Sequence, residues 1–280
     1  MTFRSYSKIN FTLEVGSKRA DGYHSLESIV QTISLYDTIS IERADNPEIR
    51  ITCSHASVPT DEKNTVYKIR ELFINKYNIN KGLRIHIEKN IPSQAGLGGG
   101  SGNASYTLLA LNRLFGTSLS AEELAELSSH VGSDCPLFIY GGTVFMTGRG
   151  EIIKPLKPFP KFYFLIVKPD FSVSTKEAYR KLDERTEIKI SDKSSLLVSL
   201  NEKNLLTELN IGDYLTNDFE LLCKDKTDKI KAILKSKGAL CSLLCGSGSC
   251  IFGIFPNREK QTEAYNSLRT EYSVFLAESL

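Results

Sequence analysis

The sequence lacks any apolar run long enough to cross a membrane. Its longest runs, such as residues 162 to 167, fall far short of the roughly 20 apolar residues that a bilayer-spanning helix needs. The N-terminus, M-T-F-R-S-Y-S-K, also lacks the apolar core of a signal peptide. These two absences predict a cytoplasmic protein without a membrane partner.

Paired cysteines are missing as well. The six cysteines, at positions 53, 135, 223, 241, 245 and 250, include no C-x-x-C pair. A chain of 280 residues can bury a core without disulfides. We therefore expect free thiols packed as small apolar side chains, and no zinc site.

An excess of charge of either sign is absent too. Thirty-five basic and 33 acidic residues give a formal charge of +2, which does not favour nucleic acid as a partner. With 41% hydrophobic and 24% charged residues, the composition is that of a globular chain forming one large domain or two ordinary ones. Binding must then rely on local charges, and no feature indicates an oligomeric state.

A glycine-rich stretch at residues 92–103, P-S-Q-A-G-L-G-G-G-S-G-N, dominates what is present. Alternating apolar residues from 83 to 87 predict a strand before it, and helical spacing from 104 to 115 predicts a helix after it. Glycine allows close backbone approach, and unpaired N–H groups at a helix N-terminus attract anions, above all phosphate. A flexible linker would not lie between two periodic elements.

The two common nucleotide-binding motifs do not fit this stretch. A P-loop needs a lysine, but none lies between Lys89 and Arg113, and the spacing G-x-G-x-x-G fails at every start. The pattern P-x-x-x-G-L-G-G-G-S-x-N-A instead resembles the phosphate-binding motif of the GHMP kinases. That resemblance implies ATP as a substrate with Mg²⁺. It also implies an ATP-binding set of Pro92, Ser93, Gln94, Ala95, Gly96, Leu97, Gly98, Gly99, Gly100, Ser101, Gly102 and Asn103.

The N-terminal segment S-Y-S-K-I-N-F-T-L predicts a strand on which Lys8 and Asn10 share a face. A lysine on a strand is usually only solvated. The next motif, R-A-D-G-Y-H-S-L, is a turn that carries Tyr23 and His24. It closely resembles the GHMP kinase branch that phosphorylates a cytidine diphosphate derivative of methylerythritol, as does L-Y-D-T-I-S-I-E at residues 35–42.

Two further residues have both a structural and a functional interpretation. Asn64 lies near the start of a predicted amphipathic helix over residues 62–77 and is either a helix-start residue or, by resemblance, an adenine contact. Asp134 in G-S-D-C-P-L-F follows a short helix that opens with the capping box S-A-E-E and stops at Gly132. It is either a helix cap or, by resemblance, the catalytic aspartate. G-R-G-E at residues 148–151 matches the turn that follows in the family.

Three prolines between residues 154 and 160 predict a crossover between domains at 1–155 and 156–280. Beyond it we expect a buried strand from 162, a helix opening at Ser174 or Thr175, and a helical pattern over 192–237. A glycine turn between two strands over 240–255, a helix near 259–271 and a strand at 273–277 complete an α+β fold with two lobes. By resemblance, G-S-G-S-C at 246–250 lies against the first glycine loop.

The resemblance covers essentially the whole chain and implies ATP-dependent phosphorylation of a 2-hydroxyl in non-mevalonate isoprenoid precursor synthesis. It implies catalysis by Lys8 and Asp134. The implied small-molecule contacts, with cytosine stacked between the two tyrosines, are Asn10, Tyr23, His24 and Tyr179. A homoserine- or mevalonate-type kinase and a non-catalytic nucleotide sensor remain alternatives. Two departures from the family pattern, Gly102 for serine and Ser105 for alanine, put a hydroxyl contact in doubt.

Overall fold

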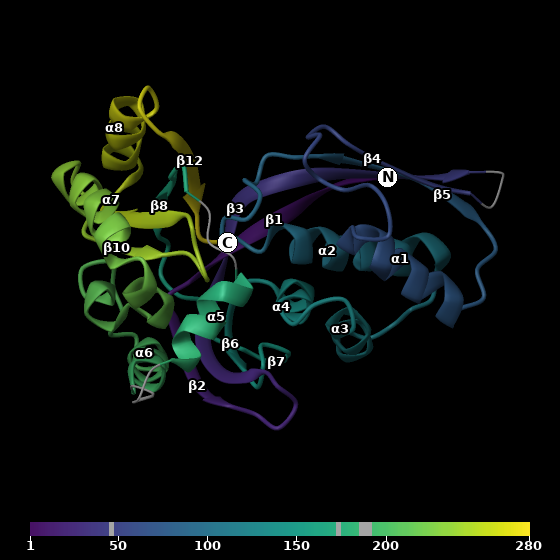
Figure 1. Cartoon of the computed structure of the whole chain (residues 1–280), viewed down its shortest axis with the longest axis horizontal. Coiled ribbons are helices and arrows are strands. Elements are labelled where there is room, and N and C mark those ends of the chain that lie inside the picture. The colour runs from purple at the N-terminus through teal and green to yellow at the C-terminus, as the bar shows by residue number, and fades with distance from the viewer. Residues whose placement is uncertain (45–47, 172–174, 185–191) are drawn as a thin grey trace. The chain divides into compact units, whose positions relative to one another are not determined.

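The computed structural model describes residues 1–44, 48–171, 175–184 and 192–280. It is an α+β fold (Figure 1), as the sequence predicts. The elements are β1 Thr2–Asn10, β2 Thr12–Lys18, β3 His24–Ala44, β4 Ile49–Cys53, α1 Thr65–Lys76, β5 Gly82–Glu88, α2 Gly99–Phe115, α3 Ala121–Ser129, α4 Cys135–Tyr140, β6 Thr143–Thr147, β7 Ile152–Pro155, β8 Tyr163–Lys168, α5 Thr175–Asp183, α6 Lys193–Glu202, η1 Ile211–Tyr214, β9 Thr216–Asn217, η2 Asp218–Leu222, α7 Lys224–Ser236, β10 Cys241–Leu244, β11 Ile251–Phe255, α8 Arg258–Leu268 and β12 Ser273–Glu278.

The chain forms two compact units whose segments interleave in sequence. Unit 1 consists of Met1–Ser7, Tyr36–Ser93 and Gly98–Gly141, and unit 2 of Lys8–Leu35, Gln94–Leu97 and Gly142–Leu280. The 21-residue strand β3 contributes to both. The predicted division at residue 155 stays a prediction.

Unit 1 places α1 and α2 against a sheet. Strand β5 pairs antiparallel with the second half of β3 and parallel with β4. Its alternating residues Leu83, Ile85 and Ile87 are buried against apolar residues of both helices, which is the period-2 pattern read from the sequence. Asn64 caps α1, because its side-chain oxygen accepts from the N–H of Val66.

Unit 2 contains the antiparallel sheet β10-β11-β8-β12, with α7 and α8 beside it in Figure 1. Strand β8 is almost wholly apolar, and Phe164, Leu165 and Ile166 have no exposed surface. The predicted strand at 162–169, the glycine hairpin and the final helix and strand are therefore confirmed. In the same unit β2 and β6 pair antiparallel with the first half of β3.

Several predicted boundaries were wrong. Helix α2 begins at Gly99, five residues earlier than the apolar pattern indicated, because glycines carry no periodic signal. Helix α3 ends at Ser129 rather than at Gly132, although its capping box is present. Phe11 separates two strands where one was expected. The stretch 192–237 also includes β9 and two short 3₁₀ helices, and Ser174 lies outside the described residues.

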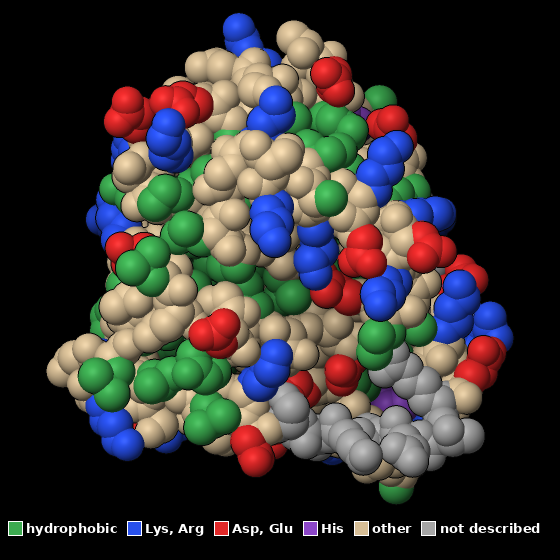
Figure 2. All heavy atoms as spheres, turned by 90° about the vertical axis from the view of Figure 1, so that its left-hand side faces the viewer, with side chains coloured by type: hydrophobic (Ala, Val, Ile, Leu, Met, Phe, Trp, Pro, Cys, Tyr) green, Lys and Arg blue, Asp and Glu red, His purple; other side chains and the backbone are tan. Residues whose placement is uncertain are grey.

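Acidic and basic side chains are interspersed over the face shown in Figure 2, in keeping with the balanced composition. Within the described ranges, no helix is long and apolar enough to cross a bilayer. The six cysteines are free thiols, as expected.

Candidate active site

The second glycine turn packs directly on the first glycine loop within unit 2. Gly96 has a positive φ of 76°, and a Cβ there would lie 1.8 Å from the carbonyl oxygen of Cys245. The N–H of Cys250 donates to the carbonyl of Ala95 at 3.2 Å. This contact confirms that G-S-G-S-C lies against the glycine loop, here its 94–97 part. Gly96 must therefore be glycine because of the protein's own packing.

Lys8 lies where these two turns meet. Its backbone N–H donates to the carbonyl of Leu97 at 3.0 Å, and the residue is only 4% exposed. The side-chain Nζ donates to Oδ1 of Asn10 at 2.8 Å. A Cβ on Gly246 would lie 3.3 Å from the same Nζ, so this glycine gives the ammonium group its room. Lys8 is therefore not solvated as a lysine on a strand usually is.

A chain of buried hydrogen bonds continues beyond Asn10. Its Nδ2 donates to Oγ of Ser28 at 2.8 Å, and the Ser28 hydroxyl donates to the carbonyl of Thr12. Since an ammonium group can only donate, Asn10 must turn its oxygen to Lys8 and its amide nitrogen to Ser28. Ser28 thereby fixes the orientation of the amide that holds Lys8. Sequence reasoning missed Ser28 because a serine on a strand gives no signal of its own.

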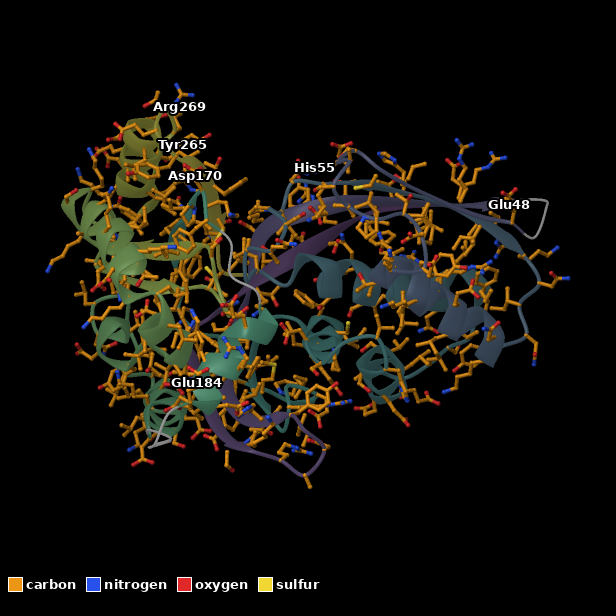
Figure 3. The ribbon with its side chains drawn as sticks, in the orientation of Figure 1. Glu48, His55, Asp170, Glu184, Tyr265 and Arg269 are labelled. Carbon is orange, nitrogen blue, oxygen red and sulfur yellow. The ribbon has the colours of Figure 1, made fainter. Side chains whose placement is uncertain are left out.

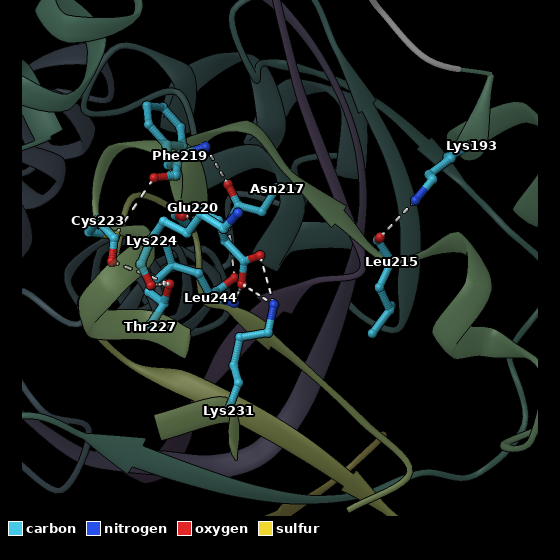
Figure 4. Close-up of polar contacts among 11 residues, drawn as sticks. Lys193, Leu215, Asn217, Phe219, Glu220, Cys223, Lys224, Thr227, Lys231 and Leu244 are labelled. Carbon is cyan, nitrogen blue, oxygen red and sulfur yellow. Dashed lines mark hydrogen bonds and ion pairs between the residues drawn. The ribbon is translucent and has the colours of Figure 1, made fainter. Parts of the chain in front are cut away.

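Polar side chains of unit 2 support the second turn (Figure 4). Asn217 Nδ2 donates to the carbonyls of Leu244 and Gly246, at 2.9 and 2.8 Å. The carboxylate of Glu220 accepts from the N–H of Leu244 at 2.9 Å and pairs with Lys231 at 3.0 Å. These contacts fix the end of β10, two residues before the glycine that makes room for Lys8.

The remaining glycines belong to the start of α2 in unit 1. Gly98 is the N-cap residue, with a left-handed φ of 70°. A Cβ on Gly102 would lie 2.7 Å from the carbonyl oxygen of Tyr6, closer than real Cβ contacts allow. At Gly100 the nearest neighbour would be Thr65 Oγ1, at 3.6 Å. Packing thus requires glycine at 96 and 102, whereas Gly100 leaves its backbone open to close approach.

Asp134 stands at the N-cap position of α4, but its side chain makes no capping hydrogen bond. Burial, together with the charge of Asp134, raises the pKa of the neighbouring Cys135 thiol to about 12. Oγ of Ser105 donates to the carbonyl of Cys135 at 2.7 Å and so fastens α2 to the start of α4. The serine that departs from the family pattern therefore has a structural role beside Asp134.

His24 and Tyr179 lie together in unit 2, and Tyr23 directly precedes His24, the first residue of β3. The His24 and Tyr179 rings are stacked with centroids 5.4 Å apart, and the 52% exposed Tyr23 has the Arg149 guanidinium 5.1 Å above its ring. His24 Nδ1 is 3.0 Å from the carbonyl of Gly16. Both nitrogens of the imidazole thus have partners, since its Nε2 is 2.9 Å from a carboxylate oxygen at the end of α5.

That carboxylate is Asp183, which also accepts from Lys18 at 3.0 Å. The Lys18 hydrogen bond, with His24 adding to it, lowers the pKa of Asp183 below its ordinary value. Glu184, which lies just beyond α5 in Figure 3, pairs instead with Arg180 at 2.8 Å. Asp183 was missed from the sequence because 159 residues separate it from His24, and no local pattern marks such a contact.

Comparison with known proteins shows which family has these motifs. The sequence-family model of the GHMP kinases N-terminal domain matches residues 64–142. The family model of the GHMP kinases C-terminal domain matches residues 200–274. The chain is 38% identical over 284 residues to the 4-diphosphocytidyl-2-C-methyl-D-erythritol kinase of Clostridium tetani, with full coverage of both chains. It is 39% identical to the enzyme of that name from Caldicellulosiruptor saccharolyticus, covering 96% of this chain and 93% of the relative.

The chain belongs to the 4-diphosphocytidyl-2-C-methyl-D-erythritol kinase family. A crystal structure of 4-(cytidine 5'-diphospho)-2C-methyl-D-erythritol kinase superimposes with a TM-score of 0.83 at 25% identity, covering 100% of this chain and 99% of the other. Methanococcus jannaschii mevalonate kinase shares the fold, with a TM-score of 0.77 at 18% identity over 100% and 98% of the two chains. The family resemblance and the kinase assignment drawn from the sequence are confirmed.

Residue roles within the 4-diphosphocytidyl-2-C-methyl-D-erythritol kinase family assignment stay predictions. Lys8 belongs to unit 2 and Asp134 to unit 1, and their catalytic pairing is not tested. Asn64 is confirmed as a helix cap, while its adenine contact is a prediction. The same holds for the ATP contacts of residues 92–103 and for the cytidine contacts of Asn10, Tyr23, His24 and Tyr179.

Proposed function

We propose that this kinase transfers the γ-phosphoryl group of ATP to the 2-hydroxyl of 4-diphosphocytidyl-2-C-methyl-D-erythritol, in non-mevalonate isoprenoid precursor synthesis. The observation that carries the proposal is the buried ammonium of Lys8, held by Asn10 where two glycine turns meet. A positive charge with low exposure attracts an anion strongly, and the transferring phosphoryl group is such an anion.

ATP is bound by backbone N–H groups of residues 92–103, with its phosphates at the N-terminus of α2. The open backbone at Gly100 supports this placement, and Asn64 is assigned to the adenine side. In the described part of the chain, no three His, Cys, Asp or Glu side chains gather as a metal site. Mg²⁺ would arrive with ATP and would offset the charge of its phosphates.

Asp134 accepts the proton of the attacking hydroxyl, and Lys8 orients that hydroxyl and offsets the charge that develops on the phosphoryl group. The transition state of phosphoryl transfer is loose, so positioning contributes more than basicity.

The cytidine group binds against Tyr23, with Tyr179 on its second face and His24 at its hydrogen-bonding edge. The 52% exposure of Tyr23 supports this assignment, and the His24 ring lies against that of Tyr179. Stacking accepts any base, so specificity must come from the edge. For a nitrogen of the His24 ring to contact cytosine, its contact with Asp183 or with the carbonyl of Gly16 must exchange for one with the base.

An ADP-release assay with three acceptors tests the function. The purified protein is given ATP, Mg²⁺ and either the cytidine substrate, homoserine or mevalonate. We expect release with the cytidine substrate only. Faster turnover of homoserine or mevalonate would assign the chain to another GHMP activity, and no turnover of any acceptor would favour a nucleotide sensor.

A further inference from the structure

Asp37 in β3 is a fully buried carboxylate in unit 1, with no exposed surface. Its Oδ1 accepts from the backbone N–H groups of Asn90 and Ile91, at 2.8 and 2.7 Å. Its Oδ2 accepts from Nζ of Lys89 at 2.7 Å and from Nδ2 of Asn103 at 3.0 Å. One side chain therefore joins the end of the segment before the glycine loop to the first turns of α2.

Because the Asp37 carboxylate is buried, it needs partners inside the protein. A buried carboxylate is costly unless it is paired and hydrogen-bonded, and here both oxygens accept two bonds each. The Lys89 side chain is 7% exposed and also donates to the carbonyl of Ile91 at 2.6 Å. Removal of either charge would leave the other buried and unpaired, so the pair acts as one unit.

The network reaches the first residue of α2. A Cβ on Gly99 would lie 3.2 Å from Lys89 Nζ and 3.1 Å from Cγ2 of Ile91. The ion pair thus takes up the space that a side chain at 99 would need. One turn later along α2, Asn103 is held by its Nδ2, while its buried Oδ1 has no hydrogen-bond partner among the described residues.

We propose that Asp37 is a positioning residue for ATP: it fixes residues 89–91 against Gly99 and Asn103, and so sets the backbone N–H groups that face the phosphates. It acts through Lys89 and Asn103 and does not itself touch ATP. The inference rests on the proposed function of the glycine loop. Lys89 neutralises the Asp37 carboxylate, which limits its repulsion of the phosphates of ATP.

Asp37→Asn tests this role with steady-state kinetics for each substrate. The variant keeps the shape and an acceptor oxygen but loses the charge and one acceptor. We expect KM for ATP to rise about tenfold, while KM for the cytidine substrate changes less than about twofold. The ATP-induced increase in Tm should shrink in parallel, because that increase depends on ATP affinity. If Asp37→Asn does not fold, Asp37→Asn/Lys89→Met, which removes both charges, is measured instead under the same expectation.

Leu234→Ala is the matched control, since it destabilises the core of unit 2 without touching this network. It should lower Tm and leave both KM values unchanged. A folded Asp37 variant with the wild-type KM for ATP would overturn the positioning role. Gly100→Val distinguishes failure of the phosphate assignment from failure of the Asp37 role. If Gly100→Val, like the Asp37 variant, leaves KM for ATP unchanged, the phosphate assignment of the loop fails. If Gly100→Val raises KM for ATP and the Asp37 variant does not, only the role of Asp37 fails.

Discussion

Lys8 donates a 2.8 Å hydrogen bond from Nζ to Oδ1 of Asn10, with both residues buried. Strand periodicity placed the two side chains on one face, but it gave no reason for the ammonium to stay away from water. The reason is packing: Gly96 and Gly246, from turns 150 residues apart in sequence, come together beside it. The pair depends in turn on Ser28, which holds the Asn10 amide.

Ser28→Ala should therefore lower kcat by about tenfold with little change in either KM. An unpaired buried donor costs about 1–3 kcal/mol, and each 1.4 kcal/mol of barrier is tenfold in rate, provided that the cost falls on the Lys8 geometry. Ser40→Ala on the same strand is the control, because its contact with Thr2 is exposed. Wild-type kcat in a stably folded Ser28→Ala variant would show that Asn10 is oriented without the hydroxyl.

Gly102→Ser, which restores the usual family residue, should destabilise this chain. The added Cβ would lie 2.7 Å from the carbonyl oxygen of Tyr6, and overpacking of this kind costs about 1–3 kcal/mol. Gly132→Ser is the control, since its Cβ would meet only an ordinary contact, Cys135 Sγ at 3.4 Å. Urea unfolding of both variants measures the difference. Equal stability of the two would mean that β1 moves aside without cost.

The local elements near the site were predictable because their signals are local. Alternation marked β5, the capping box marked α3, and the glycine motif marked the turn before α2. The sequence could not predict why individual positions must be glycine, because Gly96 packs on Cys245 and Gly102 packs on Tyr6, which lie in distant segments. The role of Asp37 could not be predicted for the same reason. Its motif at residues 35–42 resembles that of the family, but the four groups that donate hydrogen bonds to its side chain come from two other segments.

Asp183→Asn should remove a pH-dependent part of the stability. The pKa of Asp183 is lowered from its ordinary value of 3.8, so its ionised form favours the folded state. That contribution is full above the unfolded pKa and is lost as pH falls through the folded one. The variant should thus lose more unfolding free energy at pH 6 than at pH 3. Glu184→Gln, whose pair with Arg180 is exposed, should change little at either pH. An equal loss for Asp183→Asn at both pH values would contradict the ionic role.

Tyr23→Ala should raise KM for the cytidine substrate and spare KM for ATP. Base stacking on an aromatic ring contributes about 1–3 kcal/mol, which corresponds to roughly 5- to 150-fold in affinity. Tyr272→Ala serves as the control, because Tyr272 packs on the core of unit 2. Kinetics with each substrate varied in turn give the answer. If both KM values rise together, Tyr23 supports the fold of the turn rather than the base.

Transfer of a phosphoryl group to the 2-hydroxyl of the cytidine substrate is tested most directly by ³¹P NMR of the product. The carbon that bears this hydroxyl also bears the methyl group and has no hydrogen. A phosphomonoester formed there shows no three-bond coupling to a carbinol proton. We predict one new phosphomonoester resonance without that coupling, formed together with ADP. A new resonance split by carbinol protons would place the phosphate on another hydroxyl, and ADP without any phosphomonoester would reduce the reaction to ATP hydrolysis, which would contradict the account.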